Sequence, residues 1–234
     1  MKVSIIQSNY IPWRGYFDFI DDMDLTVFYD DVQYTKNDWR NRNKLKTVNG
    51  AEWITVPVRK LSLSQLIQET PIDYRGWEKK HIKSIIQWYA KAHFFKDYSE
   101  ELFAILEVKY ATISELNITL CHWIMQKLEI DTPARMSSEF ILHGSKTERL
   151  IDLLKQIGAV TYVSGPAGKG YLDERLFCEA GIGLEYKSYD YPAYPQLWGE
   201  FISEVTVLDL LFNTGPEARN YLKSRSPNQL AVAI

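Results

Sequence analysis

The sequence predicts an α/β fold, because short apolar strands alternate with amphipathic helices near both ends of the chain. The runs over residues 2–7 and 25–30 are β-branched and almost continuously apolar, which is typical of strands buried on both faces. A helix expected over residues 14–22 separates them, and this spacing favours a right-handed parallel crossover. We therefore expect a Rossmann-like parallel sheet of about five strands with helices on both faces.

The middle of the chain departs from this alternation. The turn signal Asn49-Gly50, between the runs 44–48 and 53–58, predicts a hairpin. A helical insert follows over residues 76–130. Its three helices are expected over residues 76–93, 98–109 and 112–129, with Ser114 as a candidate N-cap of the last.

The α/β alternation resumes after residue 130. Ser145, followed three residues later by Glu148, predicts the start of a helix that ends at Gly158. We expect the tail from Ser226 to be mobile, and the whole of 1–234 to form a single α/β domain. The other expected elements are strands over 134–138, 160–164 and 182–189, and helices over 172–179 and 205–212.

The composition is that of a globular protein rich in aromatic residues. The 234 residues include 7 Trp and 15 Tyr, which suit either an aromatic core or a pocket for sugars or bases. The net charge of −3 gives no general attraction to nucleic acid or to an anionic membrane. The sequence contains no apolar run of the roughly 18 residues that a membrane span needs, and the early first strand leaves no room for a signal peptide. Because Cys121 and Cys178 lack metal or redox spacing, we expect reduced thiols and a cytoplasmic protein.

Polar and aromatic side chains gather just past the first strand. They are Gln7, Asn9, Tyr10, Trp13, Gly15 and Tyr16. Ligands bind at the carboxyl edge of a parallel sheet, and the start of the following helix favours an anion such as phosphate. The alternative is a strand–helix turn that Pro12 and Trp13 merely stabilise.

Carboxylates follow the second strand in the same way. Asp30 and Asp31 are adjacent, so only one of them is expected to face the ligand, with Gln33 on the same side as Asp31. Such a carboxylate could bind ribose hydroxyls, hold a metal ion or act as a general base, or it could simply cap the next loop. His81 is a second candidate for the acid/base role, although a histidine beside lysines is commonly an ordinary surface or boundary residue.

Two further segments suit phosphate and hydroxyl groups. Asn41, Arg42 and Asn43 lie in a basic stretch in which arginine matches phosphate and asparagine matches amides or hydroxyls. Ser164 and Lys169 lie in a glycine-rich loop after another strand. A solvated hairpin face and a plain glycine-rich connection are the structural alternatives.

Several well-known catalytic motifs are absent from the sequence. It has no P-loop, no dinucleotide fingerprint, no Gly-x-Ser-x-Gly elbow and no carboxylate pair of the glycosidase type. His93, His122 and His143 lack the spacing of metal ligands, so no metal site is predicted. The candidate catalytic and binding residues are therefore those of the segments described above.

A combined pattern runs through nearly the whole chain and resembles a known family. Its residues are Gln7, Pro12-Trp13, Gly15-Tyr16-Phe17, Tyr29-Asp30-Asp31-Val32-Gln33-Tyr34, Lys36, Trp39-Arg40-Asn41-Arg42-Asn43, Trp77, Lys80-His81, Glu148-Arg149-Leu150, Tyr162, Ser164-Gly165, Gly168-Lys169, Tyr171-Leu172-Asp173, Ser203 and Val207-Leu208-Asp209. At these residues the chain resembles the WbqC-like family of bacterial proteins. Ser8 departs from the pattern, in which a proline is expected after the glutamine.

The resemblance implies work in the synthesis of O-antigen (the polysaccharide of lipopolysaccharide) and related surface polysaccharides. It points to a transferase that attaches an acyl or aminoacyl group, such as glycyl, to the amine of a nucleotide-linked amino sugar. We expect Asp31 or His81, with Asp30 as a third candidate, to be the base. Arg42, Lys169 and the helix start at Trp13 are expected to bind phosphates. The partners expected are a nucleotide sugar and an acyl donor, which could be an amino acid, acyl-CoA, a carrier protein or aminoacyl-tRNA.

The opening of the chain is also similar to pantothenate synthetase and other nucleotidyltransferase-like proteins. That similarity implies an alternative, an ATP-dependent amide-forming ligase. The phosphate-binding His-x-Gly-His of those enzymes is here Trp13-Arg14-Gly15-Tyr16, which argues against ATP, and no cofactor is assigned. A non-catalytic nucleotide-sugar-binding protein is the remaining alternative.

Overall fold

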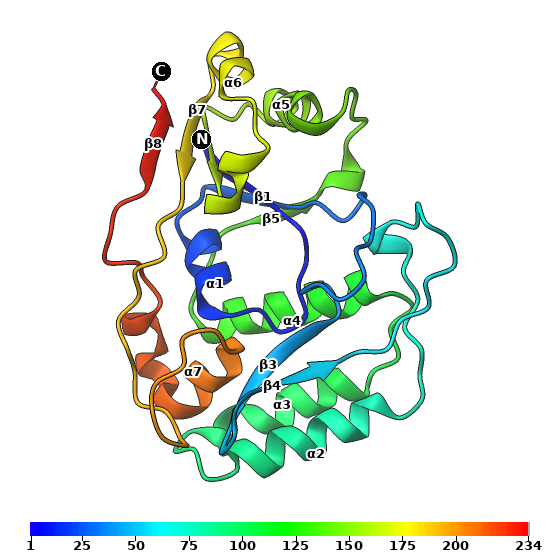
Figure 1. Cartoon of the computed structure of the whole chain (residues 1–234), viewed down its shortest axis with the longest axis vertical. Coiled ribbons are helices and arrows are strands. Elements are labelled where there is room, and N and C mark those ends of the chain that lie inside the picture. Colours follow the sequence, from blue (N-terminus) through cyan, green and yellow to red (C-terminus); the bar gives the residue numbers. More distant parts are fainter. Residues whose placement is uncertain (234) are drawn as a thin grey trace.

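A six-stranded mixed sheet lies at the centre of the molecule (Figure 1). Its strands in the computed structural model, which describes residues 1–233, are β1 Lys2–Ile6, β2 Leu25–Phe28, β5 Ala134–Met136, β6 Thr161–Ser164, β7 Gly183–Tyr186 and β8 Gln229–Val232. The strand order is β5-β2-β1-β6-β7-β8, and the first five strands in this order run parallel. The expected Rossmann-like α/β fold is confirmed.

The edge strand β8 corrects our expectation of a mobile tail. It pairs antiparallel with β7, and the side chain of Lys169 donates a hydrogen bond to Gln229. Just before the strand, Ser226 Oγ donates to Asp190 Oδ2 over 3.0 Å. Tertiary pairing therefore orders a segment that has no strong strand pattern of its own.

Helices cover both faces of the sheet (Figure 1). One face carries α5 Lys146–Gln156 and α6 Glu174–Ala180, which pack on Val3, Ile5 and Val27. The other face carries α1 Arg14–Asp21, α4 Ile113–Lys127 and α7 Val207–Thr214, which join a larger core with α2 Trp77–Tyr89 and α3 Phe95–Glu107. Short 3-10 turns lie at Ile67–Glu69, Ser137–Glu139, Pro166–Gly170 and Gly215–Tyr221.

The expected hairpin forms a separate two-stranded sheet, β3 Arg42–Thr47 and β4 Gly50–Thr55, beside the three helices of the insert. Thr47 pairs with Gly50, so the turn is Val48-Asn49, and Gly50 has a φ of 101° that favours glycine. The hairpin contacts the N-terminus of α7, because Thr206 N–H donates to Lys44 O over 2.9 Å.

Two capping predictions need revision. The N-cap of α4 is Thr112, whose hydroxyl accepts from Glu115 N–H, whereas the hydroxyl of Ser114 points inward and donates to Asp30. Ser145 is the N-cap residue of α5 as expected, but its side chain makes no capping hydrogen bond. Local sequence located both helix starts, whereas tertiary contacts direct the Ser114 hydroxyl to Asp30 and leave the capping of α4 to Thr112.

Candidate functional site

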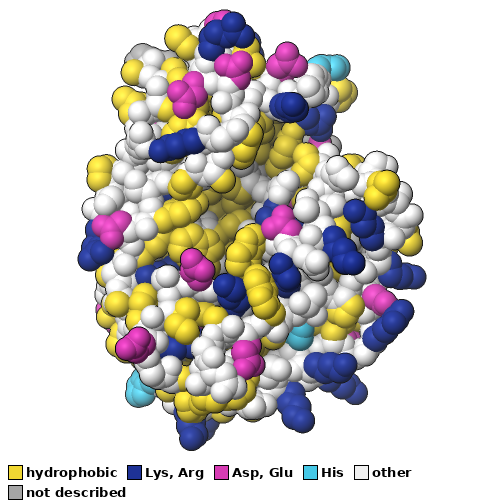
Figure 2. Space-filling view, viewed as in Figure 1, with side chains coloured by type: hydrophobic (Ala, Val, Ile, Leu, Met, Phe, Trp, Pro, Cys, Tyr) yellow, Lys and Arg dark blue, Asp and Glu magenta, His cyan; other side chains and the backbone are white. Residues whose placement is uncertain are grey.

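A cavity of about 550 Å³ lies at the carboxyl end of β1. The chain passes from β1 to β2 on one side and from β6 to β7 on the other, so the strand order reverses between β1 and β6. Ligands of open α/β sheets bind outside such a reversal. We call this space the switch-point cavity, and Figure 2 shows it as a hollow with hydrophobic side chains in its walls. Its lining residues are Asn9, Pro12, Trp13, Arg14, Trp39, Asn43, Tyr189, Asp190, Tyr191, Ser203 and Glu204.

Three aromatic rings form one wall of the cavity. The ring centroids of Trp13 and Tyr189 lie 5.1 Å apart, and those of Trp13 and Tyr191 lie 5.5 Å apart, both pairs edge to face. A Cβ atom at Gly15 would overlap the Trp13 ring, so glycine permits the ring to fold back over α1. The wall is therefore held in one arrangement before any ligand arrives.

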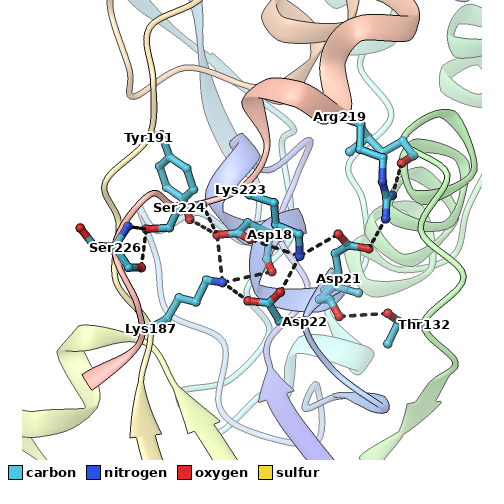
Figure 3. A network of polar contacts seen from close by, with 12 residues as sticks. Asp18, Asp21, Asp22, Thr132, Lys187, Tyr191, Arg219, Lys223, Ser224 and Ser226 are labelled. Carbon is cyan, nitrogen blue, oxygen red and sulfur yellow. Dashed lines mark hydrogen bonds and ion pairs between the residues drawn. The ribbon is translucent and has the colours of Figure 1, made fainter. Parts of the chain in front are cut away.

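A buried ionic network holds Tyr191 in this wall (Figure 3). Tyr191 OH donates to Asp18 Oδ2 over 2.8 Å, and Lys187 Nζ lies 3.0 Å from the same oxygen. Burial, and then the Asp18 carboxylate, raise the pKa of Tyr191 well above its usual range. Lys223 joins α1 to the C-terminal segment, with its Nζ 2.5 Å from Asp22 Oδ1. Figure 3 thus shows α1 tied to two segments far away in the sequence.

The loop after β1 has a strained backbone. Ile11 has a φ of 41°, which is costly for a β-branched residue, and its side chain is fully buried. Asn43 Nδ2 donates to Ile11 O over 2.7 Å and to Tyr10 O over 3.1 Å. Asn43 therefore lines the cavity and also fixes the loop that presents Asn9 and Trp13 to it.

A buried cation lies beneath the cavity. Arg14 is 2% exposed, and its guanidinium lies 5.0 Å from the ring centroids of both Tyr191 and Tyr194. It donates to Pro192 O over 2.6 Å, but its Nε and Nη2 have no partner. Burial lowers the pKa of Arg14. The positive charge is held mainly by carbonyls and ring faces.

Two carboxylates line the switch-point cavity. Asp190 pairs with Arg225 over 2.5 Å and accepts from Ser226, and the arginine in particular lowers the pKa of Asp190. Glu204 is largely exposed and lies 3.7 Å from Lys44 Nζ. Asn9 adds a buried Oδ1 without a partner. The cavity thus offers aromatic faces, amides and carboxylates together.

A second cavity of about 360 Å³ adjoins the first, and Tyr189 and Asp190 line both. We call it the lysine cavity, because Lys169 and Lys187 line it with Ser188. Lys187 forms ion pairs with Asp18 and Asp22, whereas within residues 1–233 the polar contacts of Lys169 are with the Gln229 amide and the face of Tyr186. We refer to the two adjoining cavities together as the groove.

The three candidate bases lie outside this groove. Asp30 is fully buried and accepts from Ser8 N–H over 2.8 Å, from Ser8 Oγ over 2.6 Å and from Ser114 Oγ over 2.5 Å. The serine that replaces the expected proline therefore anchors the loop, since a proline has no N–H to donate. Asp31 forms an ion pair with Arg149 over 2.5 Å and accepts from Ser137.

His81 is also enclosed by protein. It is 5% exposed, with Tyr10 OH 2.8 Å from its Nδ1 and Thr55 O 3.1 Å from its Nε2. Burial lowers the pKa of His81 to about 4. Tyr10 is fully buried in the same contact, so neither residue reaches the groove.

The other candidates divide between the groove and its supports. Asn9, Trp13, Asn43 and Lys169 line it. Gly15, Tyr16 and Gln7 support the β1 loop: Tyr16 OH donates to Gln7 O over 3.0 Å, and the Gln7 side chain accepts from Arg40. Ser164 is buried beside the glycine-rich loop. Asn41, Arg42 and Gln33 lie on the far side of the hairpin base, where Arg42 stacks on Trp53 at 4.2 Å and Gln33 donates to Leu63 O over 2.5 Å.

Sequence reasoning missed most of the far wall. Tyr189 ends the strand expected over 182–189, and Asp190 and Tyr191 directly follow it, so the same edge rule would have found them. Ser203 belongs to the combined pattern described above, and Arg14 lies in the helix start between Trp13 and Gly15. Glu204 carries no local signal, because only packing brings it to the cavity.

The fold and the groove define an α/β protein with a candidate ligand site at the switch point of its sheet. Residues 7–221 match the WbqC-like protein family, and the chain belongs to this family. It is also similar to Rv1507c of Mycobacterium tuberculosis, a protein described as uncharacterized, with 48% identity over 225 residues that cover 95% of this chain and 97% of the relative. No solved structure matches the chain.

Two properties of the described residues bear on the kind of site. Among residues 1–233, no helix has the length and apolar character needed to cross a membrane. Within the same part of the chain, His, Cys, Asp and Glu side chains form no group of three or more that could hold a metal ion.

Proposed function

We propose that this protein transfers an acyl or aminoacyl group to the amine of a nucleotide-linked amino sugar. The observation that carries the proposal is the switch-point cavity, in which an aromatic wall faces amides and carboxylates. The setting in surface-polysaccharide synthesis, and the glycyl group as one possible cargo, rest on the family resemblance.

The cavity suits a sugar with an amino group. The faces of Trp13 and Tyr189 match the apolar C–H face of a pyranose ring, and Asn9 can accept from a hydroxyl. Asp190 and Glu204 supply the negative charge that an ammonium group requires. Asp190 already pairs with Arg225, and Glu204 pairs loosely with Lys44, so an ammonium group would add a favourable charge contact that a neutral sugar lacks.

The adjoining lysine cavity suits the phosphates of the nucleotide. Lys169 Nζ has no acidic partner within residues 1–233 and lies on a glycine-rich turn, Pro166–Gly170. The two cavities adjoin at Tyr189 and Asp190, which line both. A sugar diphosphate can therefore place its ring in the first cavity and its phosphates in the second.

We propose Glu204 as the base in place of Asp31, His81 and Asp30, because Glu204 lines the switch-point cavity and the other three do not. Glu204 is exposed at the cavity and is paired only loosely with Lys44, so its carboxylate can accept a proton. Removal of a proton from the ammonium group of the sugar frees the lone pair of its nitrogen. This nitrogen then forms the new C–N bond with the carbonyl carbon of the donor. The bond between the carbonyl carbon and its leaving group breaks, and the leaving group departs with the electron pair.

The test is product formation with a nucleotide-linked 4-amino sugar and, as control, its 4-hydroxy counterpart. Incubation with acyl-CoA, or with glycine and ATP, followed by mass spectrometry should show an amide product only with the amino sugar. Glu204→Gln should reduce turnover while the affinity for the sugar nucleotide stays within a few-fold.

Other outcomes would select the alternatives. A product that forms only with ATP and releases AMP or pyrophosphate would identify the ligase. Thermal stabilisation without any product, by about 2.7 kcal/mol at a hundred times the dissociation constant, would identify a binding protein.

A further inference from the structure

A third cavity, of about 580 Å³, lies beside the base of the hairpin. The turn that contains Lys36 and Asn37 forms one side, and the loop that contains Lys60 and Leu61 forms the other. Among the described residues that line it, none is acidic. We call it the hairpin cavity.

The hairpin cavity carries uncompensated positive charge. Lys36 and Lys60 are both exposed, and within residues 1–233 neither ammonium takes part in an ion pair or a hydrogen bond. Most other lysines of the groove region are paired, as Lys44 is with Glu204 and Lys187 with Asp18. Two free ammonium groups at one cavity favour an anionic group such as a phosphate.

The cavity wall also holds an unmatched hydrogen-bond acceptor. Asn41 is 7% exposed, and its Nδ2 donates to Val56 O over 2.8 Å. Its Oδ1 is buried and has no partner. Since buried polar atoms are nearly always hydrogen-bonded, an N–H or O–H group of a ligand would complete this site.

An ordered loop presents two leucines at the rim. Leu61 and Leu63 are 73% and 81% exposed. The loop is nevertheless held in place, because Gln65 Oε1 accepts from Leu61 N–H over 2.6 Å and Gln33 Nε2 donates to Leu63 O over 2.5 Å. Exposed leucines on a hydrogen-bonded loop beside a cavity indicate an apolar contact with a ligand.

The hairpin cavity and the switch-point cavity are lined by neighbouring residues of one segment. Asn37 and Asn41 line the first, whereas Trp39 and Asn43 line the second. Asn37 is two positions from Trp39, and Asn41 is two positions from Asn43, so each step spans at most about 7 Å along the chain. A ligand with a flexible chain can therefore be anchored in one cavity and present its end to the other.

We propose that the hairpin cavity binds the 4′-phosphopantetheine arm of an acyl thioester. The arm has a phosphate for Lys36 and Lys60, an amide N–H for Asn41 Oδ1, and an aliphatic chain for Leu61 and Leu63. This inference rests on the proposed function and names its donor. The thioester carbonyl carbon forms the C–N bond, the C–S bond breaks, and the sulfur leaves as a thiolate that takes up the proton lost by the amine.

The first experiment measures binding of coenzyme A and of free 4′-phosphopantetheine by isothermal titration calorimetry, without any sugar. The double variant Lys36→Gln/Lys60→Gln should weaken both at least tenfold, since it removes the two phosphate contacts. Lys83→Gln, which removes an exposed lysine of α2 that lies outside the three cavities, is the matched control and should change the affinity less than twofold. If the double variant binds coenzyme A as tightly as the wild type does, the proposal is overturned. It is also overturned if inorganic phosphate binds as tightly as coenzyme A and depends on the same two lysines.

A second experiment distinguishes the two possible sources of the phosphopantetheine group. A carrier protein with its phosphopantetheine group attached should bind more tightly than the same carrier without it if the donor is carried on a protein, and coenzyme A should bind more tightly than the loaded carrier if the donor is free. In either case this difference in affinity should disappear in Lys36→Gln/Lys60→Gln.

The failures of the two proposals can be told apart. If coenzyme A binds in a lysine-dependent way but no amino sugar gives a product, the role of the hairpin cavity stands and the proposed transferase activity is overturned. An amide product formed from a donor that lacks phosphopantetheine, at the same rate in the double variant, would retain the transferase and overturn the donor cavity.

Discussion

The buried histidine should make the protein less stable as the pH falls. His81 contacts a carbonyl, Thr55 O, through Nε2, and a carbonyl can only accept, so Nε2 carries the proton and Nδ1 accepts from Tyr10 OH. The folded state thus holds a neutral imidazole. Burial lowers the pKa of His81 from its ordinary value of 6.5 to about 4.

The sign and size of the effect follow from proton linkage. Between pH 6.5 and pH 4 the unfolded chain binds a proton at His81 that the folded chain does not, so the free energy of unfolding falls as the pH falls through this window. At roughly 1.4 kcal/mol per pH unit, the loss amounts to about 3 kcal/mol. Above pH 6.5 the contribution is fully present.

Urea unfolding of the wild type and of His81→Gln, at pH 7 and at pH 4, measures this contribution. Other titrating groups cancel in the comparison, so the wild type should lose about 3 kcal/mol more than the variant between the two pH values. His143→Gln, which removes an exposed histidine, is the control and should lose as much as the wild type. If His81→Gln loses as much as the wild type does, the buried neutral histidine is not what destabilises the acidified protein.

Three further perturbations test the cavity wall and the core beneath it. Gly15→Ala should destabilise the protein by about 1–3 kcal/mol in chemical unfolding, because its Cβ would overlap the Trp13 ring, and the loss should shrink in a Trp13→Ala background. Tyr191→Phe should cost about 1–3 kcal/mol and reduce sugar-nucleotide affinity, because the buried Asp18 loses a donor; unchanged stability and affinity would show that this hydrogen bond does not position the ring. Burial raises the pKa of Asp209 to about 6, so protonation of this carboxyl contributes stability as the pH falls from about 6 to 4, opposite in sign to His81. Asp209→Asn should lack this contribution and therefore lose more stability than the wild type in thermal unfolding over that range.

The ionic network of Figure 3 explains why the C-terminal segment belongs to the site. Lys223 and Ser224 contact the carboxylates of α1, and Arg225 and Ser226 hold Asp190 at the cavity. The contacts of Lys223 and Ser224 join residues 201 and 206 positions apart in the chain, whereas those of Arg225 and Ser226 with Asp190 span 35 and 36. The wall that Tyr191 forms should therefore be lost when the tail is removed, even though the tail itself does not line the switch-point cavity.

The sheet could be predicted from local patterns, because strand burial is encoded in short apolar runs. Strands over 2–7 and 25–30 correspond to β1 and β2, and the edge rule pointed to the loop whose Asn9 and Trp13 line the switch-point cavity. β8 could not be predicted, because Gln229–Val232 is a strand only through its pairing with β7.

By itself, the sequence determined the α/β class, the order of the elements and the polar character of the carboxyl edge, since each depends on residues near one another in the chain. Only the tertiary structure decided which polar side chains reach the groove. Asp30 and His81 are enclosed because Ser114 and Thr55 approach them, while Tyr189 and Glu204 form a wall with Trp13 from more than 170 residues away. A side chain's exposure depends on what packs against it, and that packing partner is usually distant in sequence.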